Sequence, residues 1–159
     1  MLIRPLKNLA YKAHTYSFNP KSSREPLETS TIPLNSKTNS PKKILLVEDN
    51  PINQKMIAYF LNEIGYVVDI ANNGKEALAL YHIDYKLIIL DIGLPDIDGY
   101  TVCKLIRSLK EGKQIPIIAC TAFLLSDVSQ HCCEAGMDEV INKPTDVEEL
   151  RLLIEKYVK

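Results

Sequence analysis

The chain has 159 residues, of which 46% are hydrophobic and 25% are charged, and its formal net charge at pH 7 is −1. This composition excludes disorder throughout the chain, and the length suits one compact domain with a tail. No run of about 18 uninterrupted apolar residues occurs, so a membrane span is not expected.

The first 42 residues differ from the rest in charge and in residue type. Residues 1–42 carry seven Lys or Arg and two Glu, whereas residues 43–159 carry twelve Lys or Arg and eighteen acidic residues. From Asn19 to Lys42, Ser, Thr, Asn and Pro predominate, and such a segment cannot bury enough apolar surface to offset its chain entropy. We therefore expect residues 1–42 to be a disordered or linker-like tail. Its scattered basic charges favour a solvated tail over one that binds nucleic acid or a membrane surface, and residues 1–18 also resemble a transit peptide or the end of a preceding module.

From Lys43 onward, short apolar runs alternate with helical patterns. Apolar runs without polar alternation are typical of strands that are buried on both faces of a parallel sheet. Helices are indicated by apolar residues spaced three and four apart, with start signals such as Asn50 and Pro51 and stop signals such as Gly65. In chain order, the sequence predicts a strand at Ile44–Val47, a helix at Ile52–Ile64, a strand at Val67–Ile70, a helix at Lys75–His82, a strand at Leu87–Leu90, a helix at Tyr100–Leu109, a strand at Ile115–Cys120, a helix at Ser126–Ala135, a strand at Val140–Ile141 and a helix at Val147–Tyr157.

The alternation of five strands with five helices predicts the fold class. Each parallel pair of strands needs a crossover connection, which a helix on one face of the sheet supplies. The expected fold is therefore α/β, a doubly wound five-stranded parallel sheet with five helices. The last helix is expected to begin with a capping box of Thr145 and Glu148. Ligands of such folds bind outside the carboxyl ends of the strands.

Polar residues follow four of the predicted strands at that edge. They are Glu48 and Asp49 after the first strand, Asp91 after the third, Thr121 after the fourth and Lys143 after the fifth. Any one of them alone would be an ordinary helix cap or loop residue, but five at one edge are hard to explain in that way. Three neighbouring carboxylates repel one another unless a cation lies between them, and oxygen ligands favour Mg²⁺.

A metal-bound carboxylate beside a lysine and a hydroxyl suits attack on a phosphorus atom. Asp91 is the candidate nucleophile, and Lys143 and Thr121 are candidates to bind the remaining phosphoryl oxygens. The loop Ile92–Gly99 contains two glycines and a proline, which favour a tight turn. We expect this turn to aim the backbone carbonyl of Gly93 at the metal.

Four motifs carry a resemblance to a known family. They are ILLVEDN at Ile44–Asn50, LIILDIGLPDIDG at Leu87–Gly99, Thr121 with Ala122, and Lys143 with Pro144. In this order, at the ends of alternate elements, they resemble the response-regulator receiver domains of two-component signalling over residues 43–159. The resemblance implies the flavodoxin-like receiver fold, and the pairing of EDN with Asn53 and Gln54 is similar to receivers of hybrid sensor kinases.

The resemblance also implies a role for each site residue. Asp49 would bind Mg²⁺ directly and Glu48 through water, while Asp91 would bind the metal and become 4-aspartylphosphate. Lys143 and Thr121 would bind phosphoryl oxygens, and the Lys143–Pro144 peptide would be cis. One departure is Val140, where family members often have Tyr or Phe, so a switch by aromatic rotation is not expected.

The implied function is that of a phosphoacceptor signalling domain, which is not an enzyme beyond assisting its own phosphorylation and slow dephosphorylation. Its partners would be a histidine kinase or a histidine phosphotransfer protein and a downstream effector protein, in the cytoplasm. The helical pattern ends at Lys159, so neither a DNA-binding nor a catalytic output domain is expected, and a membrane is not expected among the partners. The alternative is a pseudo-receiver that binds proteins without phosphoryl chemistry, although such domains normally lack one of the site residues.

Two other classes of protein share parts of this pattern. A haloacid-dehalogenase-type phosphatase needs a second aspartate two residues after its nucleophile, where this chain has Gly93. A flavodoxin-like or nucleotide-binding domain needs a glycine-rich phosphate loop, but acidic residues follow Val47 here. Both classes are therefore disfavoured.

The four cysteines offer no metal-ligand spacing. Cys103, Cys120, Cys132 and Cys133 lie inside apolar stretches, and no secretory signal precedes them. We expect reduced thiols that are buried or half-buried in the core.

Overall fold

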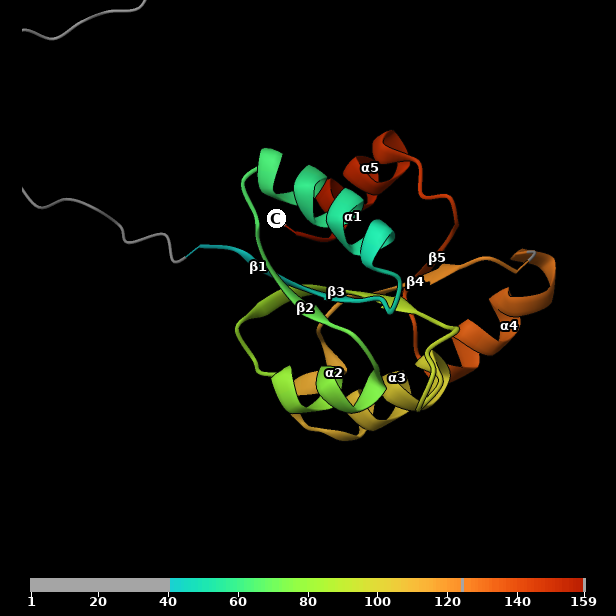
Figure 1. The fold of residues 1–159 in the computed structure, drawn as a ribbon. Helices are drawn as coiled ribbons and strands as arrows, with labels where there is room; N and C mark the ends of the chain where they lie inside the picture. The colour runs from blue at the N-terminus through green and yellow to red at the C-terminus, as the bar shows by residue number, and fades with distance from the viewer. Residues whose placement is uncertain (1–40, 124, 159) are drawn as a thin grey trace, which may run out of the picture. The chain divides into compact units, whose positions relative to one another are not determined.

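The structure is a computed structural model that describes residues 41–123 and 125–158. The predicted tail therefore lies outside the described residues, except for Pro41 and Lys42. In chain order the elements are β1 Lys43–Val47, α1 Pro51–Glu63, β2 Val67–Ala71, α2 Gly74–Leu80, β3 Tyr85–Asp91, α3 Gly99–Ser108, the short 3-10 helix η1 Glu111–Lys113, β4 Ile117–Thr121, α4 Leu125–Ala135, β5 Glu139–Asn142 and α5 Val147–Tyr157 (Figure 1).

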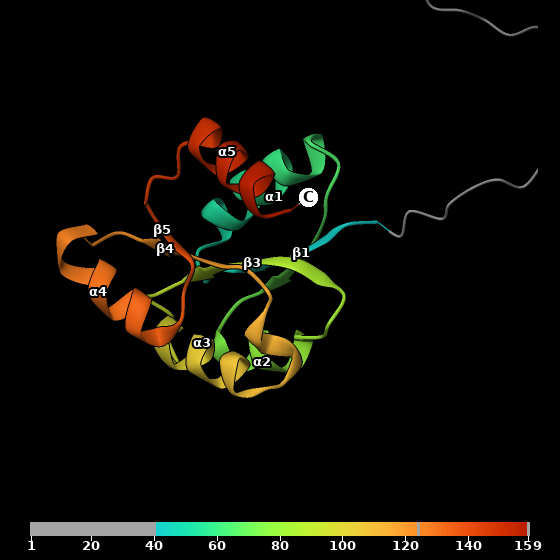
Figure 2. The ribbon, with the colours of Figure 1, turned by 180° about the vertical axis from the view of Figure 1, so that it is seen from behind.

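The strands form one five-stranded sheet in the order β2-β1-β3-β4-β5, and every neighbouring pair is parallel. Helices α1 and α5 cover one face of the sheet, and α2, α3 and α4 cover the other (Figures 1 and 2). This arrangement confirms the predicted doubly wound α/β fold. It also places the carboxyl ends of all the strands at one edge of the sheet, since parallel strands share a direction.

The sheet divides the interior into two apolar cores. Successive residues of a strand point to opposite faces, so Leu45 and Val47 pack under α2, α3 and α4, whereas Ile44 and Leu46 pack under α1 and α5. All four of these side chains are fully buried. A strand with both faces buried cannot alternate apolar with polar residues, which explains the uninterrupted apolar runs of the sequence.

The start and stop residues predicted for α1, and the glycine predicted to end α4, lie at the ends of these helices. Asn50 caps α1 by accepting hydrogen bonds from the amides of Ile52 and Asn53. Gly65 follows α1 with φ of 92°, and Gly136 follows α4 with φ of 88°, a left-handed conformation in which glycine carries no steric penalty.

Several of the sequence expectations are corrected by the structure. The residue that caps α5 is Asp146, which accepts hydrogen bonds from the amides of Glu148 and Glu149 at 2.9 Å each, so the predicted Thr145 capping box is wrong. The Thr145 hydroxyl instead lies 3.5 Å from the sulfur of Cys120 in the interior. Helix α2 ends at Leu80, two residues before the predicted end, and β4 begins two residues later than predicted, at Ile117.

A further correction concerns the cysteines. Cys103, Cys120 and Cys132 are buried as expected, but Cys133 is exposed, because it lies on the outer side of α4. All four thiols are free. Among the described residues, no helix is both long enough and apolar enough to cross a membrane.

Candidate functional site

The carboxyl edge of the sheet gathers the site residues predicted from the sequence. Glu48 and Asp49 directly follow β1, Asp91 ends β3, Thr121 ends β4 and Lys143 directly follows β5. Carboxylate oxygens of Glu48, Asp49 and Asp91 all lie within 4.8 Å of one another. Glu48 and Asp91 are buried, whereas Asp49 is exposed at the mouth of the cluster.

Lys143 joins two of the three carboxylates. Its Nζ lies 2.6 Å from Oδ2 of Asp91 and 2.6 Å from Oε2 of Glu48. Burial by itself lowers the pKa of Lys143, but the hydrogen bonds and negative charges of Asp91 and Glu48 outweigh it and hold the pKa above its ordinary value. The lysine is therefore a cation at neutral pH and links β5 to the ends of β1 and β3.

The two oxygens of Glu48 have different surroundings. Oε1 accepts hydrogen bonds from the backbone amide of Asn50 at 3.3 Å and from the side-chain amide of Asn53 at 3.0 Å. Oε2 is buried and accepts no hydrogen bond, although its distance to the Nζ of Lys143 is that of a close ion pair. Oε2 is therefore held by the charge of Lys143, and as a carboxylate oxygen with two lone pairs it can accept a further electropositive partner.

The chemistry of the cluster fits a hard divalent cation. Two unit charges 4.8 Å apart repel by about 3.5 kcal/mol at an effective dielectric constant of about 20. Lys143 offsets part of this repulsion, and the cluster of three carboxylates and one ammonium still sums to −2. An all-oxygen donor set of this kind is what Mg²⁺ prefers over softer ions.

Asp91 is held by its neighbours through both oxygens. Oδ1 accepts a hydrogen bond from the backbone amide of Gly93 at 2.8 Å, and Oδ2 accepts one from Lys143 at 2.6 Å. A Cβ at Gly93 would lie 3.7 Å from Oδ1, an ordinary contact, so space does not require glycine there. At Gly99, by contrast, a Cβ would lie 2.4 Å from the backbone oxygen of Asp91, so only glycine allows α3 to start this close to the strand end.

Thr121 lies at the end of the strand next to Asp91. Its neighbour Cys120 pairs with Asp91 across the parallel ladder between β3 and β4. The Thr121 hydroxyl is buried and accepts a hydrogen bond from the amide of Phe123 at 3.0 Å, which leaves the hydroxyl hydrogen able to donate to another acceptor. The Lys143–Pro144 peptide is cis, as expected from the sequence.

The buried thiols take no part in this chemistry. Burial raises the pKa of Cys120 to about 11, and burial likewise raises the pKa of Cys103 to about 11. Since only the thiolate is nucleophilic, both sulfurs are inert at neutral pH.

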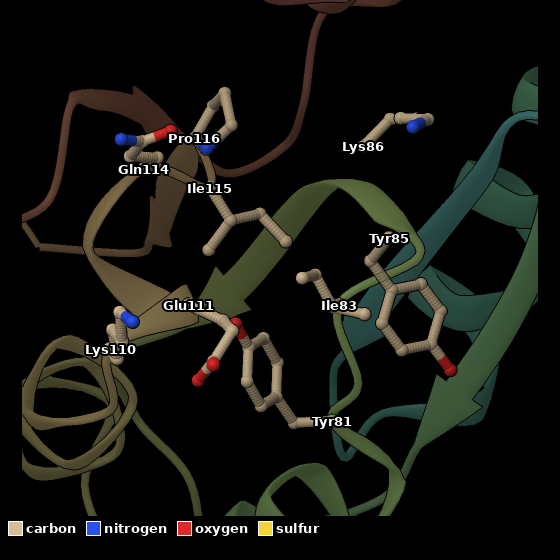
Figure 3. A pocket seen from close by; sticks show the side chains of 9 residues that line it. All are labelled: Tyr81, Ile83, Tyr85, Lys86, Lys110, Glu111, Gln114, Ile115 and Pro116. Atoms are coloured by element: carbon tan, nitrogen blue, oxygen red, sulfur yellow. The ribbon is translucent and has the colours of Figure 1, made fainter.

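A hollow of about 410 Å³ lies at the opposite edge of the sheet (Figure 3). Its lining includes Tyr85, the first residue of β3, and Ile115 and Pro116, which precede β4. These residues mark the amino ends of the strands, so the hollow is separate from the acidic cluster and lacks its carboxylates.

Sequence reasoning found the charged residues of the site but missed three residues that support them. Gln54 donates from its side-chain amide to the backbone oxygen of Glu48 at 2.6 Å, and Asn53 holds the Oε1 oxygen of the same residue. Asp96 binds the start of α2 through both carboxylate oxygens. The position of Asn53 and Gln54 in the first turn of the helix after the acidic pair was the available signal, whereas nothing local to Asp96 indicates its partner.

Comparison with known proteins identifies similar chains. A family model described as the response regulator receiver domain matches residues 44–155. Probable histidine kinase 1 of Oryza sativa subsp. indica is 32% identical over 155 residues, an alignment that covers 77% of this chain and 16% of that kinase. Sensor histidine kinase RcsC of Escherichia coli K12 is 35% identical over 124 residues, which cover 76% of this chain and 13% of RcsC. The chain thus spans less than a fifth of the length of these two relatives.

Solved structures share the fold. The receiver domain of sensor histidine kinase PA1611 from Pseudomonas aeruginosa PAO1 superposes with a TM-score of 0.68 and 35% identity, covering 75% of this chain and 98% of that one, and its crystal structure has a magnesium ion coordinated in the active-site cleft. The receiver domain of Ssk1 from Saccharomyces cerevisiae, solved with the histidine phosphotransfer protein Ypd1, superposes with a TM-score of 0.69 and 26% identity over 74% of this chain and 89% of that one.

Proposed function

This chain belongs to the response regulator receiver domain family, and on that premise we propose that Asp91 accepts a phosphoryl group from a histidine kinase or a histidine phosphotransfer protein. The observation that carries the proposal is the meeting of three carboxylates, whose oxygens lie within 4.8 Å of one another, with Lys143 at 2.6 Å from two of them. Burying Glu48 and Asp91 beside Lys143 costs desolvation energy that ion pairing often does not repay, so a functional role explains the cluster better than a purely structural one.

Glu48, Asp49 and Asp91, with the backbone carbonyl of Gly93, would hold Mg²⁺, Asp49 directly and Glu48 through water. When bound, Mg²⁺ supplies the positive charge that brings the cluster to neutrality and draws phosphoryl oxygens toward it. Oε2 of Glu48, buried and without a hydrogen bond, supports this assignment.

The proposed transfer uses the chain's own residues in the following roles. A carboxylate oxygen of Asp91 attacks the phosphorus of the donor phosphohistidine, so a phosphorus–oxygen bond forms while the phosphorus–nitrogen bond breaks. The electron pair of the broken bond stays with the donor imidazole, which takes up a proton from solvent. Lys143 leaves Oδ2 of Asp91 and follows the phosphoryl oxygens, and the Thr121 hydroxyl donates its hydrogen to one of them.

An apolar face beside the site supports a protein as the phosphoryl donor. Ile52, Met56 and Tyr59 lie at helical spacing on α1, directly after the acidic pair, and are 75%, 42% and 68% exposed. Phe123, two residues after Thr121, is 61% exposed. Exposed apolar residues that gather next to a polar site mark protein contacts. This face is assigned to the phosphodonor protein, the class of partner with which the Ssk1 receiver was solved.

The proposal is tested with a small donor that needs no partner. Intact-mass spectrometry of the chain with acetyl phosphate and Mg²⁺ should show one phosphoryl adduct, which Asp91→Asn should lack. Asp84→Asn is the matched control, because Asp84 is exposed and precedes β3 at the opposite edge. An equal adduct on Asp91→Asn would reject Asp91 as the acceptor. A wild-type chain that never forms an adduct would instead be a pseudo-receiver that acts through protein contacts alone.

A further inference from the structure

The segment Asn72–Lys75, which comprises the two residues after β2 and the first two residues of α2, contacts both the segment that carries Glu48 and the segment that follows Asp91. On one side it meets the segment after Asp91. The backbone amide of Gly74 donates to Oδ1 of Asp96 at 2.8 Å, and the amide of Lys75 donates to Oδ2 of Asp96 at 3.0 Å. One carboxylate, five residues after Asp91, therefore binds the first two amides of α2.

The start of α2 packs tightly against the segment that carries Asp96. A Cβ at Gly74 would lie 2.8 Å from the backbone oxygen of Ile97 and 2.8 Å from Cγ2 of Val102, closer than real Cβ atoms approach. Gly74 is itself buried. The start of α2 and the Asp96–Ile97 backbone are thus in direct contact, and the position of one determines the position of the other.

On the other side, Asn72–Lys75 meets the segment that carries Glu48. The side-chain amide of Gln54 donates to the backbone oxygen of Glu48 at 2.6 Å and to Oδ1 of Asn72 at 2.9 Å. Asn72 is fixed in turn by Glu76, whose Oε2 accepts from its backbone amide and from its side-chain amide at 2.8 Å each. A continuous series of contacts thus runs from Glu48 through Asn72–Lys75 to Asp96.

We propose that Asn72 and the first two amides of α2, those of Gly74 and Lys75, form a brace that holds the two acid-bearing segments in position, with Asn72 and Asp96 as its two positioning residues. Lys143 pairs with Glu48 and Asp91. Within residues 41–123 and 125–158, however, no ion pair joins Asp49 to a cation, so the lysine does not fix the position of Asp49 relative to Asp91. The ladder between β1 and β3 ends at the pair Val47 and Leu90, directly before the acidic residues. Beyond that pair, repulsion between the carboxylates pushes the two segments apart, and the brace opposes that movement.

This inference rests on the proposed function and extends it to residues that touch neither metal nor phosphate. Groups that hold ligating residues in place affect metal affinity almost as strongly as the ligands, typically by about 10- to 100-fold. Asp96 and Asn72 do not contact the ligating side chains and act on them only through the backbone, so we expect a loss of Mg²⁺ affinity at the lower end of that range. Both should weaken Mg²⁺ binding while Asp91 remains chemically intact.

The test compares Asp96→Ala, Asn72→Ala and the double variant with Asn73→Ala. Asn73 is the matched control, because it caps the same helix by accepting from the amide of Glu76 but does not contact the Asp96 segment. Calorimetric titration with Mg²⁺ should give a dissociation constant about tenfold higher for each brace variant and within about twofold of wild type for Asn73→Ala. Because cutting either end disconnects the brace, the double variant should lose much less than the product of the two single effects. Asp96→Asn, which keeps one acceptor oxygen, should fall between wild type and Asp96→Ala.

Thermal unfolding of the same variants separates positioning from stability. Asn73→Ala and Asp96→Ala should lower Tm by similar amounts, and only the second should weaken Mg²⁺ binding. If both variants change Mg²⁺ affinity equally, or if the two brace effects multiply fully, the brace is refuted while phosphorylation of Asp91 is untouched.

Failure of the proposed function looks different. If the wild-type chain neither binds Mg²⁺ nor forms an adduct, the proposed phosphotransfer is wrong. The brace is then tested by NMR on the metal-free protein. There, the amide of Gly93 should shift in the NMR spectrum of Asp96→Ala and stay in place in Asn73→Ala, because Gly93 shares its loop with Asp96. An unmoved Gly93 amide in Asp96→Ala overturns the brace.

Discussion

Replacing Lys143 by methionine should remove the cation that contacts both buried carboxylates while keeping a stem of similar length. Glu48 and Asp91 would then face each other with no positive charge between them. Their oxygens lie within 4.8 Å, which corresponds to a repulsion of about 3.5 kcal/mol at an effective dielectric constant of about 20. Breaking a buried ion pair from one side typically costs 3–5 kcal/mol. Since the lysine side chain is 15% exposed, some screening remains, and we expect Lys143→Met to lose about 3 kcal/mol of unfolding free energy at pH 7.

Urea unfolding followed by circular dichroism measures this loss, and Mg²⁺ provides the decisive second condition. The metal-free cluster changes from −2 to −3 when the lysine is lost, so the variant should bind Mg²⁺ more tightly than wild type. A ligand at ten times its dissociation constant stabilises the folded state by about 1.4 kcal/mol. Addition of Mg²⁺ should therefore narrow the difference between Lys143→Met and wild type.

The control for this experiment is Lys156→Met. Lys156 also contacts a carboxylate, Glu139, at 2.7 Å, but its side chain is 59% exposed on the far side of the domain, so its loss should have little effect on stability. An unfolding free energy of Lys143→Met equal to that of Lys156→Met would refute the reasoning. So would a difference from wild type that is the same with and without Mg²⁺.

Four further results are expected. The pKa of Lys143 is higher in the folded chain than in the unfolded one, so its stabilising effect should be constant below about pH 10 and decline as the pH rises through the folded-state pKa. The unfolding free energies of wild type and Lys143→Met should therefore approach each other in alkali. Asp49→Ala should weaken Mg²⁺ binding more than Glu48→Ala in calorimetric titration, and equal affinity of Asp49→Ala and wild type would rule out the metal site. A chain that starts at Lys42 should fold and take phosphate like the full chain, whereas a stability loss above ~2 kcal/mol would show that the tail packs on the domain. With beryllofluoride, a mimic of the phosphoryl group, changes in amide chemical shift should concentrate around Asp91 and the loop after Thr121, because the Val140 side chain is too short to fill the space that an aromatic ring would occupy. Comparable changes throughout α5 would contradict this.

Much of the fold could be read from local patterns. The fully buried strand residues Ile44 to Val47 appear in the sequence as one apolar run, since both of their faces meet helices. Once five parallel strands alternate with five helices, the residues at the carboxyl ends of the strands must share an edge. That single geometric consequence is why Glu48, Asp91 and Lys143, which are far apart in the chain, could be predicted to meet.

Local patterns did not predict the structural role of a residue correctly where two neighbouring residues suit the same role equally well. Thr145 and Asp146 are both good capping residues, and only the packing of Thr145 against Cys120 leaves the cap to Asp146. Cys132 and Cys133 are adjacent and chemically identical, yet one is buried and the other exposed, because a helix turns 100° per residue and the sequence does not state where α4 rests on the sheet.

The sequence by itself determined the period of each element, the direction of the sheet and therefore the chemical membership of the acidic cluster. Only the tertiary structure decided how those members are held. The two oxygens of Glu48 have different partners, Lys143 bridges two carboxylates rather than one, and Asp96 binds Gly74 across 22 residues of chain. The physical reason is the distance along the chain over which each effect acts. Propensity and periodicity act over a few residues, whereas a hydrogen bond to a distant backbone amide depends on the packed positions of every element between the two.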